Sequence, residues 1–186
     1  MTKTEEIMPL ANEIACAARK TFLKLYRNGK RYYYCTLYTT GEGHTPSSSA
    51  WSREALEREA TNQAIDSNIS QPEMAALIKW SYANSPYCDF GGENFSNVRQ
   101  CLNERPSFYD LTGKEWQQEL TIRLKAMELA IKKLDEEGLF ALNQTRDSIC
   151  ILVEVMPPEE INTEIALRLN NQSSTAFQQW LVEAAE

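Results

Sequence analysis

The segment DSICILVEVMPP, residues 147–158, limits the folds open to this chain more than any other part of the sequence. It predicts a strand at 147–156 with apolar residues on both faces, and Pro157 and Pro158 end that strand. A strand that is apolar on both faces is normally an inner strand, with packed elements above and below it. The segment therefore predicts a central strand in a sheet that is covered by helices.

A tyrosine-rich segment at residues 31–40 predicts a second strand, because tyrosine and threonine are common in strands. The alternation of side chains along a strand places Tyr32 and Tyr34 on the same face. The GEG that follows, residues 41–43, supplies glycines for a hairpin turn, and residues 45–51 predict the returning strand. The two strands are expected to form an antiparallel hairpin.

Most of the remaining chain shows the apolar spacing and the capping residues of helices. Because proline is unfavourable inside a helix, the first regular helix is expected to begin near Pro9, and its apolar pattern places Cys16 in the core. Helices are predicted to begin at or next to Pro9, Ser52, Ser70, Phe95, Thr112, Glu159 and Thr175. Ser52 and Thr175 are expected as caps, Ser70 and Thr112 as the first residues of capping boxes, and Gly138 as the end of the helix that follows Thr112. Together these elements predict an α+β fold, with a small, mainly antiparallel sheet packed against several helices in a single domain over residues 1–186.

The sequence predicts no disulfide, metal or cofactor site. The five cysteines are odd in number, widely spaced and without a CxxC pair, which disfavours a disulfide framework and a zinc knuckle. The chain has one histidine, so a multi-histidine metal site is excluded. Neither a P-loop pattern nor a complete dinucleotide fingerprint is present.

The chain is expected to be cytoplasmic and to have no membrane partner. Its 42% of hydrophobic and 24% of charged residues are ordinary for a soluble globular protein. No apolar run approaches the roughly 18 residues that span a bilayer. The first segment, MTKTEEIMPLANE, lacks the uninterrupted apolar stretch of a signal peptide.

The charge of the chain is −7 and is unevenly distributed. Residues 1–50 hold 7 Lys and Arg against 4 Asp and Glu, whereas residues 51–186 hold 12 against 22. An acidic majority repels nucleic acid and favours a basic protein as partner. A nucleic-acid contact through the basic residues between Arg19 and Arg31 is the least favoured of three hypotheses.

The lone histidine, His44, follows the predicted hairpin turn and offers a route to catalysis. With Ser47, Ser48 or Ser49, a cysteine, or an acid, it would form the core of a small enzyme acting on an unknown substrate. An exposed residue on a hairpin tip is the simpler interpretation. The enzyme hypothesis requires a cavity around His44, with a nucleophile or carboxylate within hydrogen-bond reach.

The segment SYANSPYCDFGGENF predicts an ordered, irregular loop that carries aromatic and acidic side chains. Aromatic side chains beside a few charges are typical of protein interfaces. The loop residues Tyr82, Tyr87, Asp89 and Glu93 are therefore the candidate partner-binding residues, and Glu42 of the hairpin would join them if the two loops converge. This acidic, aromatic-bearing surface predicts a non-enzymatic protein that binds another protein.

Five short segments, YYYCTLYTTGEG, IKWSYANSPY, KKLDEEGLF, RDSICILVEV and RLNN, occur in this order along nearly the whole chain. In that order the sequence resembles the bacterial family called domain of unknown function 4303. The resemblance implies a small cytoplasmic protein of bacteria. Some members of the family are found beside polymorphic toxins and are proposed as immunity proteins. The resemblance therefore implies a cognate toxin as the partner, which the acidic surface would occlude.

Overall fold

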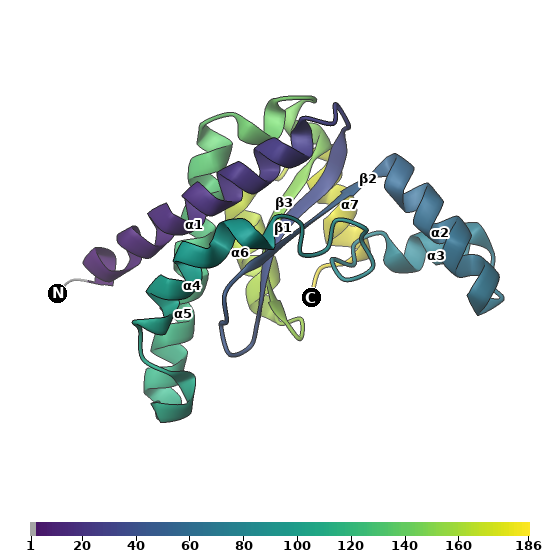
Figure 1. Ribbon diagram of the computed structural model, residues 1–186. Helices are drawn as coiled ribbons and strands as arrows, with labels where there is room; N and C mark the ends of the chain where they lie inside the picture. Colours follow the sequence, from purple (N-terminus) through teal and green to yellow (C-terminus); the bar gives the residue numbers. More distant parts are fainter. Residues whose placement is uncertain (1–2) are drawn as a thin grey trace.

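The computed structural model describes residues 3–186, with side chains from Glu6 onward, and is built around a three-stranded sheet in the order β2-β1-β3 (Figure 1). The middle strand, β1 (Tyr32–Thr40), pairs antiparallel with β2 (Ser47–Ser52) and parallel with β3 (Cys150–Met156). The sheet is therefore mixed, with one pair of each kind, and not mainly antiparallel as predicted, because β3 runs parallel to β1. The predicted α+β class is confirmed, and the sheet and its helices form one domain.

Helices cover the sheet on both faces (Figure 1). In chain order they are α1 (Lys3–Tyr26), α2 (Arg53–Ser67), α3 (Gln71–Ile78), η1 (Gly92–Phe95), α4 (Ser96–Asn103), η2 (Phe108–Asp110), α5 (Gly113–Glu136), η3 (Leu139–Ala141), η4 (Arg146–Ser148), α6 (Glu160–Leu169) and α7 (Thr175–Glu183). One face carries α1, α4 and α5, and the other carries α2, α3 and α7. Helix α6 lies along β3 and contributes to both cores.

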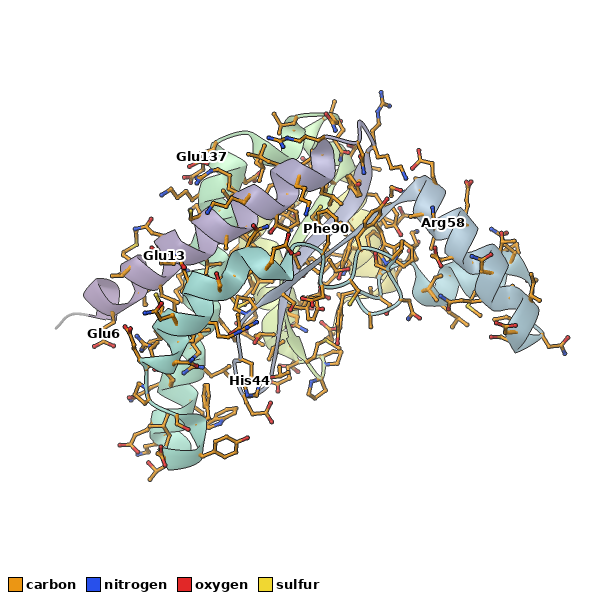
Figure 2. All side chains as sticks on the ribbon, in the orientation of Figure 1. Glu6, Glu13, His44, Arg58, Phe90 and Glu137 are labelled. Carbon is orange, nitrogen blue, oxygen red and sulfur yellow. The ribbon has the colours of Figure 1, made fainter. Side chains whose placement is uncertain are left out.

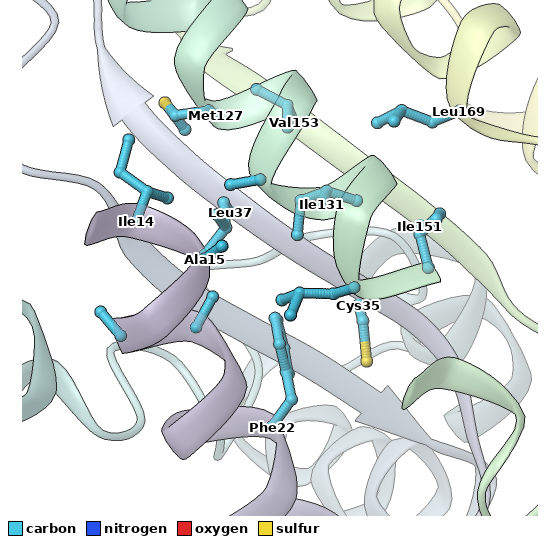
Figure 3. Packing of buried hydrophobic residues seen from close by; sticks show 14 of the residues in the cluster. Ile14, Ala15, Phe22, Cys35, Leu37, Met127, Ile131, Ile151, Val153 and Leu169 are labelled. Carbon is cyan, nitrogen blue, oxygen red and sulfur yellow. The ribbon is translucent and has the colours of Figure 1, made fainter. Parts of the chain in front are cut away.

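The larger core lies between the sheet and the pair α1 and α5 (Figure 3). Its central side chains come from α1 (Ile14, Phe22), α5 (Met127, Ile131), β1 (Cys35, Leu37) and β3 (Ile151, Val153). Each large apolar side chain that is fully buried contributes about 1.5–3 kcal/mol. The apolar pattern predicted for the first helix is confirmed over most of its length, because residues at three- and four-residue steps are buried, namely Leu10, Ile14, Ala18, Phe22 and Leu25.

Strand β3 is an edge strand, so its predicted central position is wrong, although six of its seven residues are buried as expected. Two buried asparagines occupy the place of a neighbouring strand. The amide of Asn162 accepts from the Val155 nitrogen at 2.7 Å and donates to its oxygen at 3.1 Å. The amide of Asn170 does the same at Ile151, at 3.0 and 2.7 Å. A strand that is apolar on both faces is thus predicted to be covered on both faces, but its position in the strand order does not follow from this pattern.

The beginning of β1 also departs from the prediction. The pairing with β2 shifts register between Tyr32 and Tyr34, which is the mark of a β-bulge. Tyr32 therefore packs on the α1 side, edge-on to Tyr26 with ring centroids 5.4 Å apart, whereas Tyr34 packs in the opposite core. The prediction that the two tyrosines share a face is wrong, because one extra residue reverses the alternation.

Three local predictions about helices are wrong. Helix α1 begins at Lys3 and contains Pro9, whose missing donor removes only one backbone hydrogen bond from a helix that the buried residues around it hold in place. Cys16 is exposed, because it lies about half a turn from the buried Ile14 and Ala18. Helix α7 is capped by the side chain of Ser174 and not by Thr175.

Other predicted helix ends are confirmed. The side chain of Ser52 accepts from the Ala55 nitrogen at 3.1 Å, and the capping boxes at Ser70 and Thr112 are present. Gly138 has a φ of +79° after α5, a conformation that glycine adopts without strain. These ends were predictable because each depends on residues within one turn of the cap.

Removing the side chain of Asn170 tests whether the edge of β3 depends on it. We expect Asn170→Ala to lower the free energy of unfolding by about 2–4 kcal/mol, because two buried backbone groups of Ile151 lose their partners. Urea unfolding followed by circular dichroism measures the loss. Asn171→Ala, at the exposed neighbouring position, is the matched control and should cost less than about 1 kcal/mol. Equal losses in the two variants would show that the amide has no special role.

Candidate functional site

A cavity of about 260 Å³ lies where the β1–β2 hairpin turns against the chain that precedes α5. Its lining residues are Glu42, His44, Thr45, Leu102, Asn103, Arg105, Pro106, Ser107, Phe108, Tyr109 and Arg123. We refer to it as the hairpin-tip cavity. His44 is labelled at the tip of the hairpin in Figure 2.

A buried arginine fixes one wall of this cavity. Arg123 of α5 donates to the backbone oxygens of Gly43 and Pro106, at 2.9 and 3.1 Å, and to Glu119 at 2.7 Å. Gly43 has a φ of +60°, which favours glycine, and a Cβ there would lie only 3.1 Å from the Arg123 side chain. The arginine therefore ties the hairpin turn to α5 and gives the tip a defined shape.

The charge of Arg123 is balanced inside the protein. Glu119, whose side chain is 5% exposed, accepts from Arg123 and also from two nitrogens of Arg105, at 2.6 and 2.7 Å. Burial by itself would raise the pKa of Glu119, but the hydrogen bonds from Arg105 and Arg123 outweigh it and lower the pKa. A second carboxylate, Glu6, lies 3.8 Å from Arg105, so the group is a structural brace in which two arginines face two carboxylates.

The imidazole of His44 lies at the mouth of the cavity, where its side chain is 60% exposed. Its Nδ1 lies 2.7 Å from the Thr40 hydroxyl and 3.9 Å from Glu42 Oε2. The pKa of Glu42 is lowered by a hydrogen bond from its own backbone N–H, by the Thr40 hydroxyl and by His44. A hydroxyl is thus within hydrogen-bond reach of the imidazole, and the nearest carboxylate is slightly beyond it.

Two of the three serines that were expected as partners for His44 make other contacts. Ser48 and Ser49 are 1% exposed, and their hydroxyls donate to the backbone oxygens of Phe90 and Tyr82. Both hydroxyls therefore hold the segment of residues 81–95, which we refer to as the aromatic loop. The hydroxyl that lies within hydrogen-bond distance of the His44 ring is that of Thr40.

The aromatic loop is ordered by contacts with β2. Besides the two serine contacts, the Trp51 indole donates to the Ser81 oxygen at 2.8 Å, and the Ser85 hydroxyl donates to the Ala50 oxygen. Residues 48–52 of β2 are all buried. The loop therefore covers the strand at this edge of the sheet, which explains its irregular but fixed path.

The candidate residues of the loop differ in exposure. Tyr82 and Tyr87 are half-buried, since Tyr82 stacks on Tyr38 at 4.0 Å and Tyr87 packs edge-on to Tyr32 at 5.5 Å. Asp89 and Glu93 are exposed. Glu93 forms an ion pair with Lys24 of α1 at 3.1 Å. The two acids of the loop, Asp89 and Glu93, are thus exposed to solvent, whereas the two tyrosines, Tyr82 and Tyr87, also contribute to the packing of the sheet.

Among the candidate partner-binding residues, Glu42 is the one that lines the hairpin-tip cavity. It is exposed at the hairpin tip, and none of the four loop residues lines this cavity. That cavity adds a residue that the sequence analysis missed, Tyr109, whose side chain is 89% exposed. The sequence feature that could have indicated Tyr109 is the short FYD segment between Pro106 and Thr112, where an aromatic residue stands outside any apolar pattern.

The basic residues late in α1 are partly ion-paired. Arg19 contacts Glu137 at 2.6 Å, and Lys24 contacts Glu93 at 3.1 Å. Within residues 3–186, no three His, Cys, Asp or Glu side chains gather as a metal ion would require. No helix of the described chain is long and apolar enough to cross a membrane.

Glu154 of β3 is a buried carboxyl outside both candidate surfaces. The Tyr34 hydroxyl donates to its Oε2 at 2.5 Å. Burial raises the pKa of Glu154 to about 7, and the hydrogen bonds from Thr36 and Tyr34 limit the rise, while the nearby Glu186 adds to it. No cation is paired with it among the described side chains, so in the folded protein this carboxyl is mainly protonated below about pH 7.

The fold and its surfaces define a one-domain α+β protein with a mixed three-stranded sheet and a braced hairpin tip. By sequence, the chain belongs to the family described as domain of unknown function DUF4303, which it matches over residues 12–171. Neither the curated proteins nor the solved structures contain a significant match to it.

Replacing Glu154 tests the pKa of this buried carboxyl. Because the folded pKa of about 7 exceeds the unfolded value of 4.5, its contribution to stability is fully present below pH 4.5 and is lost as the pH rises through 7. Relative to Glu154→Gln, the wild type should therefore lose on the order of 3 kcal/mol in free energy of unfolding between pH 4.5 and 8. Urea unfolding over this pH range measures the difference. Parallel curves for the two proteins would contradict a raised pKa.

Proposed function

We propose that this protein is a non-enzymatic bacterial immunity protein that acts in the cytoplasm by binding a cognate toxin and covering its active site. The observation that carries the proposal is the hairpin tip, where the 89% exposed Tyr109 lies at the same cavity as the exposed Glu42. An exposed aromatic side chain next to an acid is the composition of a protein-binding hot spot. The resemblance to a family with proposed immunity members supplies the kind of partner.

Charge supports a basic partner. The net charge is −7, and the buried carboxylates Glu119 and Glu128 are neutralised by internal arginine and lysine partners. The exposed acids Glu42, Asp89 and Asp110 therefore remain available to an approaching cationic surface. Many toxins that act on nucleic acid have such a surface, because their substrate is anionic. Complementary charge would speed the encounter and would make it sensitive to salt.

Rigidity of the hairpin tip supports tight binding. Arg123 holds the turn through Gly43 and also stacks on the ring of Phe108, with its Cζ 4.4 Å from the ring centroid. A surface that is already in its bound shape loses little conformational entropy when a partner docks. The exposed acids of the aromatic loop, Asp89 and Glu93, would extend the contact if the toxin reaches both surfaces.

Co-expression with the toxin encoded by the neighbouring gene tests the proposal. Wild-type protein should protect the cells, and Glu42→Lys should slow toxin association at least about tenfold, because it replaces attraction by repulsion at the docking point. Glu57→Lys, the same change at an exposed site on α2, is the control and should leave association within about twofold. Association rates measured by surface plasmon resonance at two salt concentrations complete the experiment. The proposal fails if cells die equally with and without the wild-type protein.

A small enzyme is the second candidate, and one observation favours it. The hairpin-tip cavity adjoins His44, whose Nδ1 lies 2.7 Å from the Thr40 hydroxyl. If the protein inactivated its partner chemically, His44→Ala should abolish protection while the complex still forms. Under occlusion, His44→Ala should protect as well as the wild type, since exclusion of substrate needs no proton transfer.

A further inference from the structure

A second cavity, of about 500 Å³, lies at the opposite end of β1 from the hairpin tip. It is open to solvent and is lined by Arg31, Tyr32, Tyr33, Arg53, Gln144, Thr145 and Ser148. We refer to it as the basic pocket, because it contains two arginines and no acid in a chain of net charge −7. The length of β1 separates it from the hairpin-tip cavity by about 25 Å.

The two arginines of the basic pocket have no carboxylate partner among the described side chains. Arg53 lies over the Tyr33 ring, with its Cζ 4.5 Å from the ring centroid, and its hydrogen bond to Gln179 is long, at 3.5 Å. Stacking holds a guanidinium plane in place while leaving its N–H groups free at the edge. Arg53 is therefore oriented but not neutralised.

Two acids near the pocket have their carboxylates engaged elsewhere. Glu183, which lines a neighbouring pocket together with Arg53, forms an ion pair with Lys79 at 2.7 Å. The pKa of Glu54 is lowered first by its own backbone N–H at the start of α2 and then by Ser52, and only to a lesser extent by Lys30 and Arg31. Glu54 does not line the cavity. The guanidinium of Arg31 thus keeps the ability to bind an external anion.

The other polar groups of the pocket divide into used and available donors. Gln144 bridges the backbone nitrogen and oxygen of Tyr32, and the Tyr33 hydroxyl donates to the Lys79 oxygen. The hydroxyl of Thr145 has no hydrogen-bond partner among the described residues, and that of Ser148 donates to the Thr145 oxygen. The available donors are therefore two guanidinium groups and a hydroxyl around an aromatic floor.

We propose that the basic pocket binds the phosphate group of a small phosphorylated molecule. Arginine forks match phosphate oxygens in pairs, and a hydroxyl adds a third direction, which suits a tetrahedral anion better than a planar carboxylate. The volume falls within the range of about 300–1,000 Å³ found for small-molecule sites, which leaves room for more than the phosphate itself. The site is separate from the hairpin tip and does not depend on the partner proposed there.

Titration calorimetry with inorganic phosphate and with ribose 5-phosphate, at low ionic strength, tests this site. Ribose 5-phosphate should bind at least about threefold more tightly than phosphate, and Arg31→Ala and Arg53→Ala should each weaken it at least about tenfold. Arg99→Ala, an exposed arginine of α4 outside the pocket, is the control and should have no effect. Backbone NMR shifts should move at Tyr33, Thr145 and Ser148 and should stay unchanged at His44.

Two outcomes would overturn the site. The first is no binding of either compound to the wild type at 10 mM ligand, about the concentration at which even a weak site would be filled. The second is equal weakening by Arg31→Ala, Arg53→Ala and Arg99→Ala, which would indicate diffuse attraction of anions. Circular dichroism of each variant establishes that it is folded, and all three arginines are exposed.

Discussion

The structure depends on how the outer side of β3 is closed. Strand β3 is buried and pairs with only one strand, so its other backbone groups would have no partners without the amides of Asn162 and Asn170. Both amides come from the α6 region, which the turn after β3 brings back along the strand. Because β1 is held between β2 and β3, this closure also fixes the base on which the hairpin and its tip are built.

Local signals in the sequence predicted the elements, and distant contacts decided their arrangement. Ser52, Ser70 and Gly138 mark helix ends through neighbours within one turn, so the sequence alone was sufficient. The edge position of β3 depends on asparagines that lie 7 residues after Val155 and 19 residues after Ile151. The apolar periodicity of the sequence does not predict such a pairing. The bulge at the start of β1 inverted the face of Tyr32 for a similar reason, since pairing with β2 determines where an extra residue is accommodated.

The candidate sites likewise combine features that the local sequence predicts with features that depend on contacts between distant residues. Aromatic composition could not separate an interface from packing, and Tyr82 and Tyr87 turned out to contribute to the packing of the sheet. His44 was easy to find because the chain has no other histidine, but its neighbour Tyr109 comes from a segment far away in sequence. The basic pocket could not be predicted from a sequence with an acidic majority. Arg31 and Arg53 come close together only because the hairpin pairs the beginning of β1 with the end of β2.

The covering of β2 by the aromatic loop has a consequence for how this protein can meet others. Proteins with a free sheet edge can recruit an extended peptide as an additional strand, and the same edge exposes them to self-association into fibres. Here one outer strand lies under the loop and the other under asparagine amides and a helix. Strand addition would first require one of these covers to detach, so recognition has to proceed through side chains on turns and helices.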